Sequence, residues 1–381
     1  MLKDVNYLVL SDIHLFHKKN RTEEIIANLN RYFDDFSPKS QFANLDMLFI
    51  AGDLFDTLVE FPNRDAHMAL FWLSRLIDFC SRQNIKLRIL EGTPSHDHRQ
   101  SKTAEILVQS MDTAVDFKYI DTLHIEHVKD LGLHILYMPD EITASADLTL
   151  RHVKQLMSEN QLDQVDIGIF HGCFTYQMGG HLNNQCHDEA TYLSLVRYFI
   201  NIGHFHTFSA YERIIAEGSF DRLKHGEEEP KGGVLCHISK AGEYTYSFIE
   251  NKHAKIFKTI DIRGQDLDKA FNRLDKLLLT IPDNSYIRIK ASKDHPIYIA
   301  FDDVKKRYPM YFFNKMSDDE EEHTYQLIDS DSIFNHRYES ITLTQDNIVP
   351  TLLTEINGKY VLTDSQLKLL THTLEHTKCL L

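Results

Sequence analysis

The sequence has few cysteines, and their arrangement would not build a structural site. They are odd in number and form no C-x-x-C pair: Cys80, Cys173, Cys186, Cys236 and Cys379. A zinc ribbon and a disulfide framework are both disfavoured, because each needs thiols that cluster or pair. We therefore expect reduced thiols, which are typical of the cytoplasm.

Long apolar runs are also missing. No run reaches the roughly 20 residues that a membrane-spanning helix needs. The first residues show no basic stretch followed by the apolar core of a secretory signal. The expected location is the cytoplasm, or the host cytoplasm for a viral sequence, with no membrane partner.

An excess of positive charge is the third absence. The chain has 41 Lys and Arg against 56 Asp and Glu, a formal net charge of −15. This argues against a free-standing basic nucleic-acid binder, which needs positive charge to hold phosphates. It does not exclude a nucleic-acid enzyme, because divalent cations and a basic partner can offset the repulsion locally.

What is present is enough material for a core. Of the 381 residues, 43% are hydrophobic, which suits two domains and a small third unit. Apolar runs alternate with helical patterns over residues 1–262, and this alternation predicts an α/β layered fold. The predicted strands are Tyr7–Leu10, Met47–Ala51, Leu87–Leu90, His134–Tyr137, Ile167–Phe170 and Phe199–Ile202. The predicted helices are Glu23–Phe33, Asp65–Arg82, Lys102–Met111 and Leu148–Glu159.

Later apolar runs have no long helices between them. They are Arg213–Ala216, Val234–Ile238, Tyr244–Ile249 and Ala254–Ile260. We expect them to form a mainly antiparallel second sheet, which gives a sandwich of two sheets flanked by helices.

Two further parts are predicted beyond "DIRGQD" at 261–266. Residues 266–328 have a helical pattern over Leu267–Leu279, a strand over Tyr286–Ala291, a helix over Ile299–Arg307 and a short apolar run at 310–313. We expect the acidic stretch 317–322 to form a solvated loop. Residues 340–381 carry two amphipathic helix candidates, and Thr363 with Gln366 fits a capping box for the second. That helix packs on its own domain or docks a partner.

Four apolar runs end in residues that could hold a metal ion. The series is "SDIH" at 11–14, "GD" at 52–53, "HG" at 171–172 and "GHFH" at 203–206. Side chains at i and i+2 of an extended strand end point the same way, and parallel strands end at one edge of a sheet. The candidate ligands are Asp12, His14, Asp53, His171, His204 and His206.

Each motif alone has an ordinary structural explanation. The pair Asp12 and His14 could stand on a surface loop, Asp53 could cap a helix, and His171 could be a core histidine. Together they offer more ligands than one ion uses, so a dinuclear site is the natural interpretation. Imidazole mixed with carboxylate suits manganese, iron or zinc. Two such ions can clamp the attacking and leaving oxygens of a phosphate ester.

The series "SDIH", "GDLFD", "SHD", "HG" and "GHFH" resembles the calcineurin-like metallophosphoesterase superfamily. More narrowly, it resembles the SbcD family of exonuclease subunits, the bacterial counterpart of the Mre nuclease subunit of double-strand-break repair. "GDLFD" is typical of that branch, and "EGSFDRLKHGEEEPKGG" at 217–233 is similar to the segment after its last histidine pair. The motifs cover residues 5–265, and the rest is similar only in layout.

The resemblance implies a four-layer α-β-β-α sandwich with a small α/β DNA-capping domain and C-terminal helices. The third motif departs from the family pattern Gly-Asn-His-Asp. Here Gly92 is separated from His96 and Asp97, and Ser95 stands in the place of the asparagine that holds the second metal. A serine hydroxyl is a shorter and weaker ligand, and Asp97 or His98 could compensate. We interpret the site as modified and still active, in a divergent member of phage or cellular origin.

Site roles follow from the resemblance. Asp12, His14 and His206 hold the first cation, His171 and His204 hold the second with weaker help from Ser95, and Asp53 bridges. His96 is the acid or transition-state stabiliser, and Asp56 supports the catalytic centre from three residues beyond Asp53. Arg222 and Lys224 contact the substrate phosphate or are simply solvated.

The resulting hypothesis is a manganese-dependent DNA nuclease, with 3′–5′ exonuclease and single-strand endonuclease character. Iron, zinc or magnesium are alternative metals. The family implies a homodimer and a coiled-coil ATPase partner similar to SbcC, docked on the C-terminal helices. Two rival hypotheses stay open: a phosphoesterase for small phosphodiesters or phosphoproteins, and a non-enzymatic scaffold on the same fold.

Overall fold

The computed structural model describes residues 3–17, 22–59, 62–140, 145–178 and 185–317. Two six-stranded mixed sheets dominate it, so the chain has an α/β fold as predicted. The first sheet has the order β12-β11-β1-β2-β3-β4 and the second has the order β5-β6-β7-β8-β10-β9.

The first sheet consists of β1 (Val5–Leu10), β2 (Met47–Ala51), β3 (Lys86–Leu90), β4 (Phe117–Ile120), β11 (Gly232–Ile238) and β12 (Tyr244–Glu250). The second consists of β5 (His124–Val128), β6 (Leu133–Met138), β7 (Ile167–His171), β8 (Ile200–Gly203), β9 (Ser209–Tyr211) and β10 (Ile214–Ala216). The helices of this part are α1 (Thr22–Tyr32), α2 (Arg64–Gln83), α3 (Pro94–Asp97), α4 (Thr103–Ser110), α5 (Ala146–Glu159) and α6 (Glu189–Leu195). Short 3-10 turns are η1 (Asp34–Phe36), η2 (Gln100–Lys102) and η3 (Thr175–Met178).

Strand alternation explains how the two sheets are covered. In β1, Tyr7 and Val9 belong to a buried cluster that also holds residues of the second sheet, while Leu8 and Leu10 belong to a cluster with α1 and α2. The rings of Phe49 and Tyr137, from β2 and β6, lie 6.3 Å apart across the two sheets. The period of two therefore lets each strand face the other sheet on one side and helices on the other.

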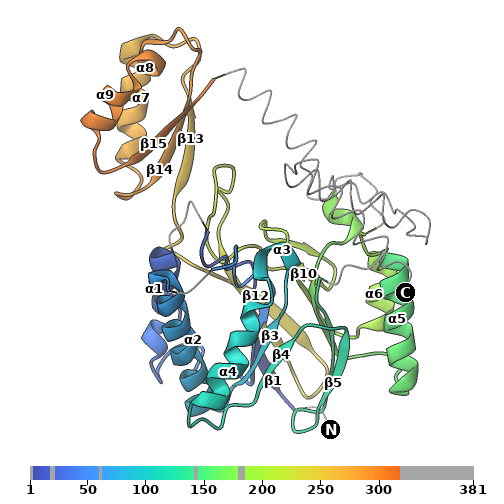
Figure 1. Cartoon of the computed structure of the whole chain (residues 1–381). Helices are drawn as coiled ribbons and strands as arrows, with labels where there is room; N and C mark the ends of the chain where they lie inside the picture. The colour runs from blue at the N-terminus through green and yellow to red at the C-terminus, as the bar shows by residue number, and fades with distance from the viewer. Residues whose placement is uncertain (1–2, 18–21, 60–61, 141–144, 179–184, 318–381) are drawn as a thin grey trace, which may run out of the picture. The chain divides into compact units, whose positions relative to one another are not determined.

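The second sheet is built in the same way. Its outer residues cluster with α5 and α6, through Val153 and Tyr192. Figure 1 shows α1 and α2 on one side of the strands and α5 and α6 on the other. The six strands and four helices predicted for residues 1–202 match β1–β3, β6–β8, α1, α2, α4 and α5 to within a few residues.

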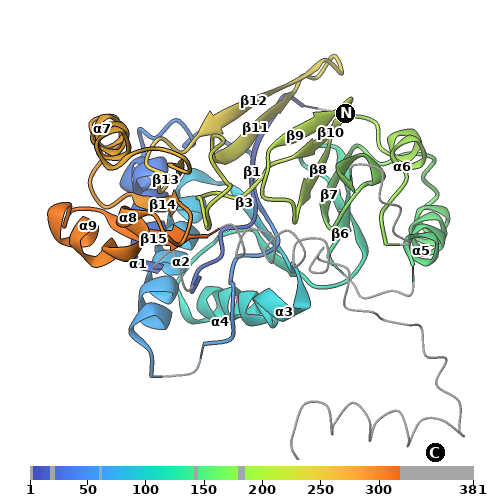
Figure 2. The ribbon, with the colours of Figure 1, turned by 90° about the horizontal axis from the view of Figure 1, so that it is seen from above.

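The predicted antiparallel second sheet is wrong. β10 pairs in parallel with β8, and β11 and β12 extend the first sheet beside β1 in antiparallel pairing. Figure 2 shows β11 and β12 next to β1. The apolar runs revealed the strands correctly but carried no information on which strand each would pair with.

The last of those runs belongs to a third sheet. β13 (Phe257–Asp261), β14 (Tyr286–Lys290) and β15 (Phe312–Met316) pair in parallel in that order. Its helices are α7 (Leu267–Leu278), α8 (Pro296–Ile299) and α9 (Phe301–Arg307). Ile260, Ile287 and Ile289 point to these helices and form one core with Leu274 and Val304. This small sheet thus begins before the expected boundary at residue 262.

By internal contacts the chain divides into residues 1–324 and 325–381. The predicted helices of 340–381, including the one starting at Thr363, lie outside the described residues, as does the acidic stretch beyond Ser317. The three-part division stays a prediction. None of the helices in the described ranges is long and apolar enough to cross a membrane.

Candidate metal centre

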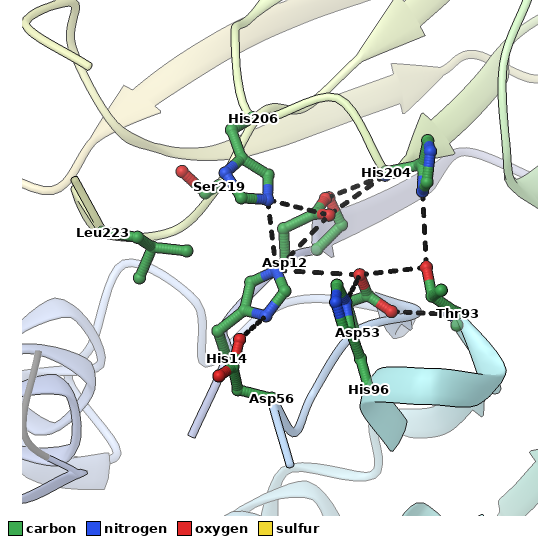
Figure 3. Close-up of polar contacts among 12 residues, drawn as sticks. Asp12, His14, Asp53, Asp56, Thr93, His96, His204, His206, Ser219 and Leu223 are labelled. Carbon is green, nitrogen blue, oxygen red and sulfur yellow. Dashed lines mark hydrogen bonds and ion pairs between the residues drawn. The ribbon is translucent and has the colours of Figure 1, made fainter. Parts of the chain in front are cut away.

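The ends of β1, β2, β7 and β8 bring the predicted ligands together. The chain beyond β1 stays paired with the chain beyond β2, since the Asp12 N–H donates to Gly52 O at 3.1 Å and the His14 N–H to Asp53 O at 3.0 Å. From β8, the His204 N–H donates to both carboxylate oxygens of Asp12, at 3.1 and 3.0 Å. Figure 3 shows the side chains of Asp12, His14, Asp53, His204 and His206 lying close together.

The backbone at these residues is strained. Asp12, His14 and Asp53 have φ values of 48°, 51° and 50°, and His204 has 105°. A non-glycine residue in this region costs of order 1–3 kcal/mol, and such residues gather at functional sites. Four strained residues at one place indicate that the backbone is held in this conformation to bring these side chains together.

The first ligand group is Asp12, His14 and His206, whose ligand atoms all lie within 4.8 Å of one another. Nδ1 of His14 lies 2.9 Å from Asp56 Oδ1, and Nδ1 of His206 lies 2.9 Å from Glu227 Oε1. Each carboxylate holds a proton on the Nδ1 atom beside it. The two Nε2 atoms then face each other at 3.2 Å, and their lone pairs repel unless a positive charge joins them.

The second ligand group is Asp53, His171 and His204. Nδ1 of His171 lies 2.8 Å from Ala51 O and so donates, which leaves Nε2 directed at Asp53 Oδ1 at 3.4 Å. Burial alone would lower the pKa of His171, but the Asp53 carboxylate outweighs it and raises that pKa to about 10. His204 instead stays neutral, because burial and the nearby His171 lower its pKa to about 4.

Asp53 is the common member of two of the ligand groups in the described residues. It belongs with His171 and His204, and also with His14 and His96. Burial opposes its charge, yet His171, His96 and His14 together hold the pKa of Asp53 well below its usual range. A carboxylate that stays ionised while buried and faces histidines on both sides is suited to bridging two cations.

His96 also approaches this carboxylate. Its Nδ1 lies 2.9 Å from Asp53 Oδ2, and its side chain is 38% exposed. The hydrogen bond to Asp53 raises the pKa of His96 in spite of partial burial. His96 is thus a histidine beside Asp53 whose protonated form is favoured and whose side chain keeps contact with solvent.

The opening of α3 corrects the prediction for Ser95. Pro94 begins that short helix, and Ser95, the next residue, is exposed. Thr93 takes its place: Oγ1 lies 3.3 Å from Asp53 Oδ2, 3.4 Å from His171 Nε2 and 3.3 Å from His204 Nδ1. Proline favours the first position of a helix, so α3 begins at Pro94. Thr93, just before it, therefore stays beside Gly92 in the site.

Asp97 and His98 do not compensate as ligands. Asp97 is buried and accepts N–H groups from Gly92 at 2.8 Å, Asp53 at 3.0 Å and Phe55 at 2.8 Å. Burial, Asp53 and Glu91 raise the pKa of Asp97 to about 8. It holds the loops after β2 and β3 together, and His98 is exposed.

The structure also corrects the prediction for Arg222. Its side chain is buried, and the guanidinium donates to the carbonyl oxygens of Glu229 at 3.1 Å, Ala254 at 3.3 Å and Lys255 at 3.2 Å. It is therefore a structural tie and not a phosphate contact. Lys224 is exposed, and its predicted substrate contact stays a prediction.

Sequence reasoning missed three residues of the centre: Thr93, Glu227 and Asp140. Asp140 follows β6 and hydrogen-bonds Thr93. Burial raises the pKa of Asp140, and the charges of His171 and Asp53 also act on it. The signal that could have revealed Asp140 is "YMPD", another acidic residue just past a strand. For Glu227 the signal was the acidic "GEEE" loop, but the sequence alone does not show that Glu227 contacts His206.

Comparisons with known proteins leave the family open. No family model matches the sequence, and no curated protein does. Among solved structures, one titled "GAP50 the anchor in the inner membrane complex of Plasmodium" covers 66% of this chain and 85% of its own, at 13% identity and a TM-score of 0.37. A glutamine-dependent NAD+ synthetase from Acinetobacter baumannii in complex with ADP covers 94% of this chain and 73% of its own, at 12% identity and a TM-score of 0.32. Likenesses this distant carry no argument about function.

Proposed function

We propose that this protein is a metal-dependent phosphodiesterase acting on DNA, a divergent nuclease similar to SbcD that works with two divalent cations. The observation that carries the proposal is the facing pair of Nε2 atoms of His14 and His206, each ring having its Nδ1 held by a carboxylate. This arrangement calls for a positive charge between the rings. The mixed imidazole and carboxylate donors suit manganese first, with iron, zinc or magnesium as alternatives.

The chain's own residues divide the work. Asp12, His14 and His206 would hold one cation, and Asp53 would be shared. His171 and His204 would hold the other, with Thr93 nearby in the position expected of Ser95. A bound cation pair supplies charge that activates water and neutralises a phosphodiester.

Proton handling falls to His96. It is half-exposed and hydrogen-bonded to Asp53, which favours its protonated form. A protonated imidazole facing solvent can donate its proton to a departing sugar oxygen. Asp56 and Glu227 act as positioning residues, because they fix the tautomers of His14 and His206 and act on the substrate only through these histidines.

The finer parts of the hypothesis belong to the same proposal. We infer that the two sheets with their helices form the four-layer α-β-β-α sandwich of metallophosphoesterases, and that the small sheet around β14 serves as the capping unit. A homodimer and an SbcC-like ATPase that docks on residues 340–381 would complete the enzyme in the cytoplasm. The layered clusters on both sheets support the first of these inferences.

Substrate choice provides the test. The full chain would be incubated in manganese with linear double-stranded DNA and, separately, with a chromogenic phosphodiester. We expect DNA to be shortened, and expect Asp53→Asn to abolish cleavage while the surface variant Asp78→Asn retains it. Turnover of the small ester alone would favour a small-molecule phosphoesterase, and no turnover with less than one bound ion per chain would favour a scaffold.

A further inference from the structure

Two buried thiols lie next to each other outside the metal centre. Sγ of Cys173 and Sγ of Cys186 are 2.8 Å apart, and the side chains are 2% and 7% exposed. The two residues are separated in the sequence by the segment 174–185. Sulfur atoms this close need only a small shift to reach bonding distance.

The backbone holds these thiols together independently of the sulfur atoms. The His187 N–H donates to Cys173 O at 2.9 Å, and the Thr175 N–H donates to His187 O at 3.1 Å. Phe174 and His187 form a parallel bridge. Thr175 Oγ1 also donates to Glu189 at 2.7 Å, at the start of α6. The pair is therefore pre-positioned by this backbone bridge and by the Thr175–Glu189 hydrogen bond, which hold together the chains that follow the two cysteines.

A metal site is the obvious alternative use for two thiols. Among the described residues, the groups able to hold a cation are those at the strand ends, and neither thiol belongs to one. Cys80 in α2 and Cys236 in β11 sit in two other buried clusters. The neighbouring thiols are thus placed for each other and not for a metal ion.

We propose that Cys173 and Cys186 form a reversible disulfide when the protein meets hydrogen peroxide. The Cys186 sulfur attacks one peroxide oxygen, the O–O bond breaks and water leaves, which gives a sulfenic acid. The Cys173 sulfur then attacks the Cys186 sulfur, the S–S bond forms, the S–O bond breaks and a second water leaves. Two thiols are oxidised by two electrons in all, and one peroxide is reduced.

The location gives this chemistry a consequence. Cys173 lies two residues beyond His171, at the end of β7. The disulfide would tie the chain directly behind that histidine to the chain that enters α6. The inference does not depend on the proposed nuclease activity, because it concerns only the thiols.

The test uses the full chain, reduced and then exposed to hydrogen peroxide. Free thiols counted after denaturation should fall from five to three per chain, and return on adding dithiothreitol. Trypsin leaves both cysteines in one peptide, residues 155–197, which should lose two hydrogens. Chymotrypsin, which cuts after Phe174 or Tyr176, should yield two peptides joined by a reducible cross-link.

Variants distinguish this pair from the other cysteines. Cys186→Ser should remove the cross-link, and Cys379→Ser should keep it. The proposal is overturned if Cys173 and Cys186 are recovered as free or over-oxidised sulfurs, or if the cross-link joins either one to another cysteine. Because the decisive measurement is made on the unsubstituted chain, a poorly folded variant would not obscure it.

Discussion

Each imidazole of the candidate centre is oriented by a bond at its other nitrogen. Asp56 and Glu227 hold His14 and His206, and a backbone carbonyl holds His171. Such bonds fix the tautomer and reduce the freedom that a metal ion would otherwise have to remove. The residues around the ligands are therefore as specific to the site as the ligands.

The assignment to Thr93 of the role predicted for Ser95 can be tested by a matched pair of variants. Thr93→Ala should weaken the binding of one of two manganese ions by about 10–100-fold, as loss of a ligand-supporting group does. Thr93 makes no capping hydrogen bond in α3, so helix stability should not change. Ser95→Ala should leave both affinities unchanged in calorimetric titration. The opposite result for the two variants would return the role to Ser95.

The pH dependence of metal binding follows from His171. Without a cation, Asp53 raises the pKa of His171 to about 10 against the effect of burial, so the ring is protonated at neutral pH. A cation must displace that proton, and at lower pH the proton competes with the cation more strongly. Apparent manganese affinity should rise by about tenfold per pH unit for each displaced proton between about pH 6.5 and 8.5. Calorimetry in buffers of different ionisation enthalpy would count the protons, and a pH-independent affinity would contradict the expectation.

At this scale the sequence predicted the ligands and missed their neighbours. Asp12 and the histidine pair at 204 and 206 could be predicted because each follows an apolar run, and strand ends meet at an edge. Thr93 could not, because Pro94 starts a short helix and changes which residue faces inward. Arg222 could not either, since a sequence does not show that an arginine will be buried among carbonyl groups.

Among the elements, the close approach of β8 to β2 and β7 limits what can stand at the site. A Cβ atom on Gly203 would lie 2.4 Å from Ala51 O, 2.8 Å from His171 Nδ1 and 2.9 Å from Ser11 Cβ. Only glycine fits there, because two of these neighbours belong to the centre's own scaffold. Strand packing and ligand geometry are thus coupled.

Gly203→Ala should therefore affect both stability and metal binding. Overpacking of this kind costs about 1–3 kcal/mol of the free energy of unfolding, and it should displace the His171 ring. The control is Gly264→Ala, whose φ is +67° with open space around it. That change should cost about 1 kcal/mol from backbone strain and leave manganese affinity unchanged. Equal manganese affinity in both variants would show that the packing of β8 does not shape the site.

Element identity was easier to predict than element partnership. Apolar period and length located most of the strands and helices. The same signals could not show that β11 and β12 would join β1, because the pairing depends on contacts between residues more than 200 positions apart, such as Val9 with Val234.

Across the whole molecule, Arg222 joins the loop after β10 to the chain that leads from β12 into β13. Its guanidinium holds carbonyl groups of residues 229, 254 and 255. Arg222→Ala would leave these buried acceptors without their donor and should lower the free energy of unfolding by about 2–3 kcal/mol. Lys224→Ala, at an exposed neighbour, should change it by less than about 0.5 kcal/mol. Urea unfolding compares the two, and equal stability would contradict the structural role of Arg222.

Charge sets a further condition on the whole chain. A net charge of −15 opposes the approach of DNA, and the carboxylates of the candidate centre add to that opposition locally. Bound cations would reverse the sign of the field at the point where a phosphate must come. Metal binding is therefore the step on which every other part of the proposed function depends.

Anomalous diffraction from crystals of the full chain soaked in manganese tests that step most directly. We expect two peaks, one among Asp12, His14 and His206 and one among Asp53, His171 and His204, with the Asp53 carboxylate touching both. A single peak, or none at these strand ends, would contradict the two-metal centre and remove the basis for assigning a nuclease.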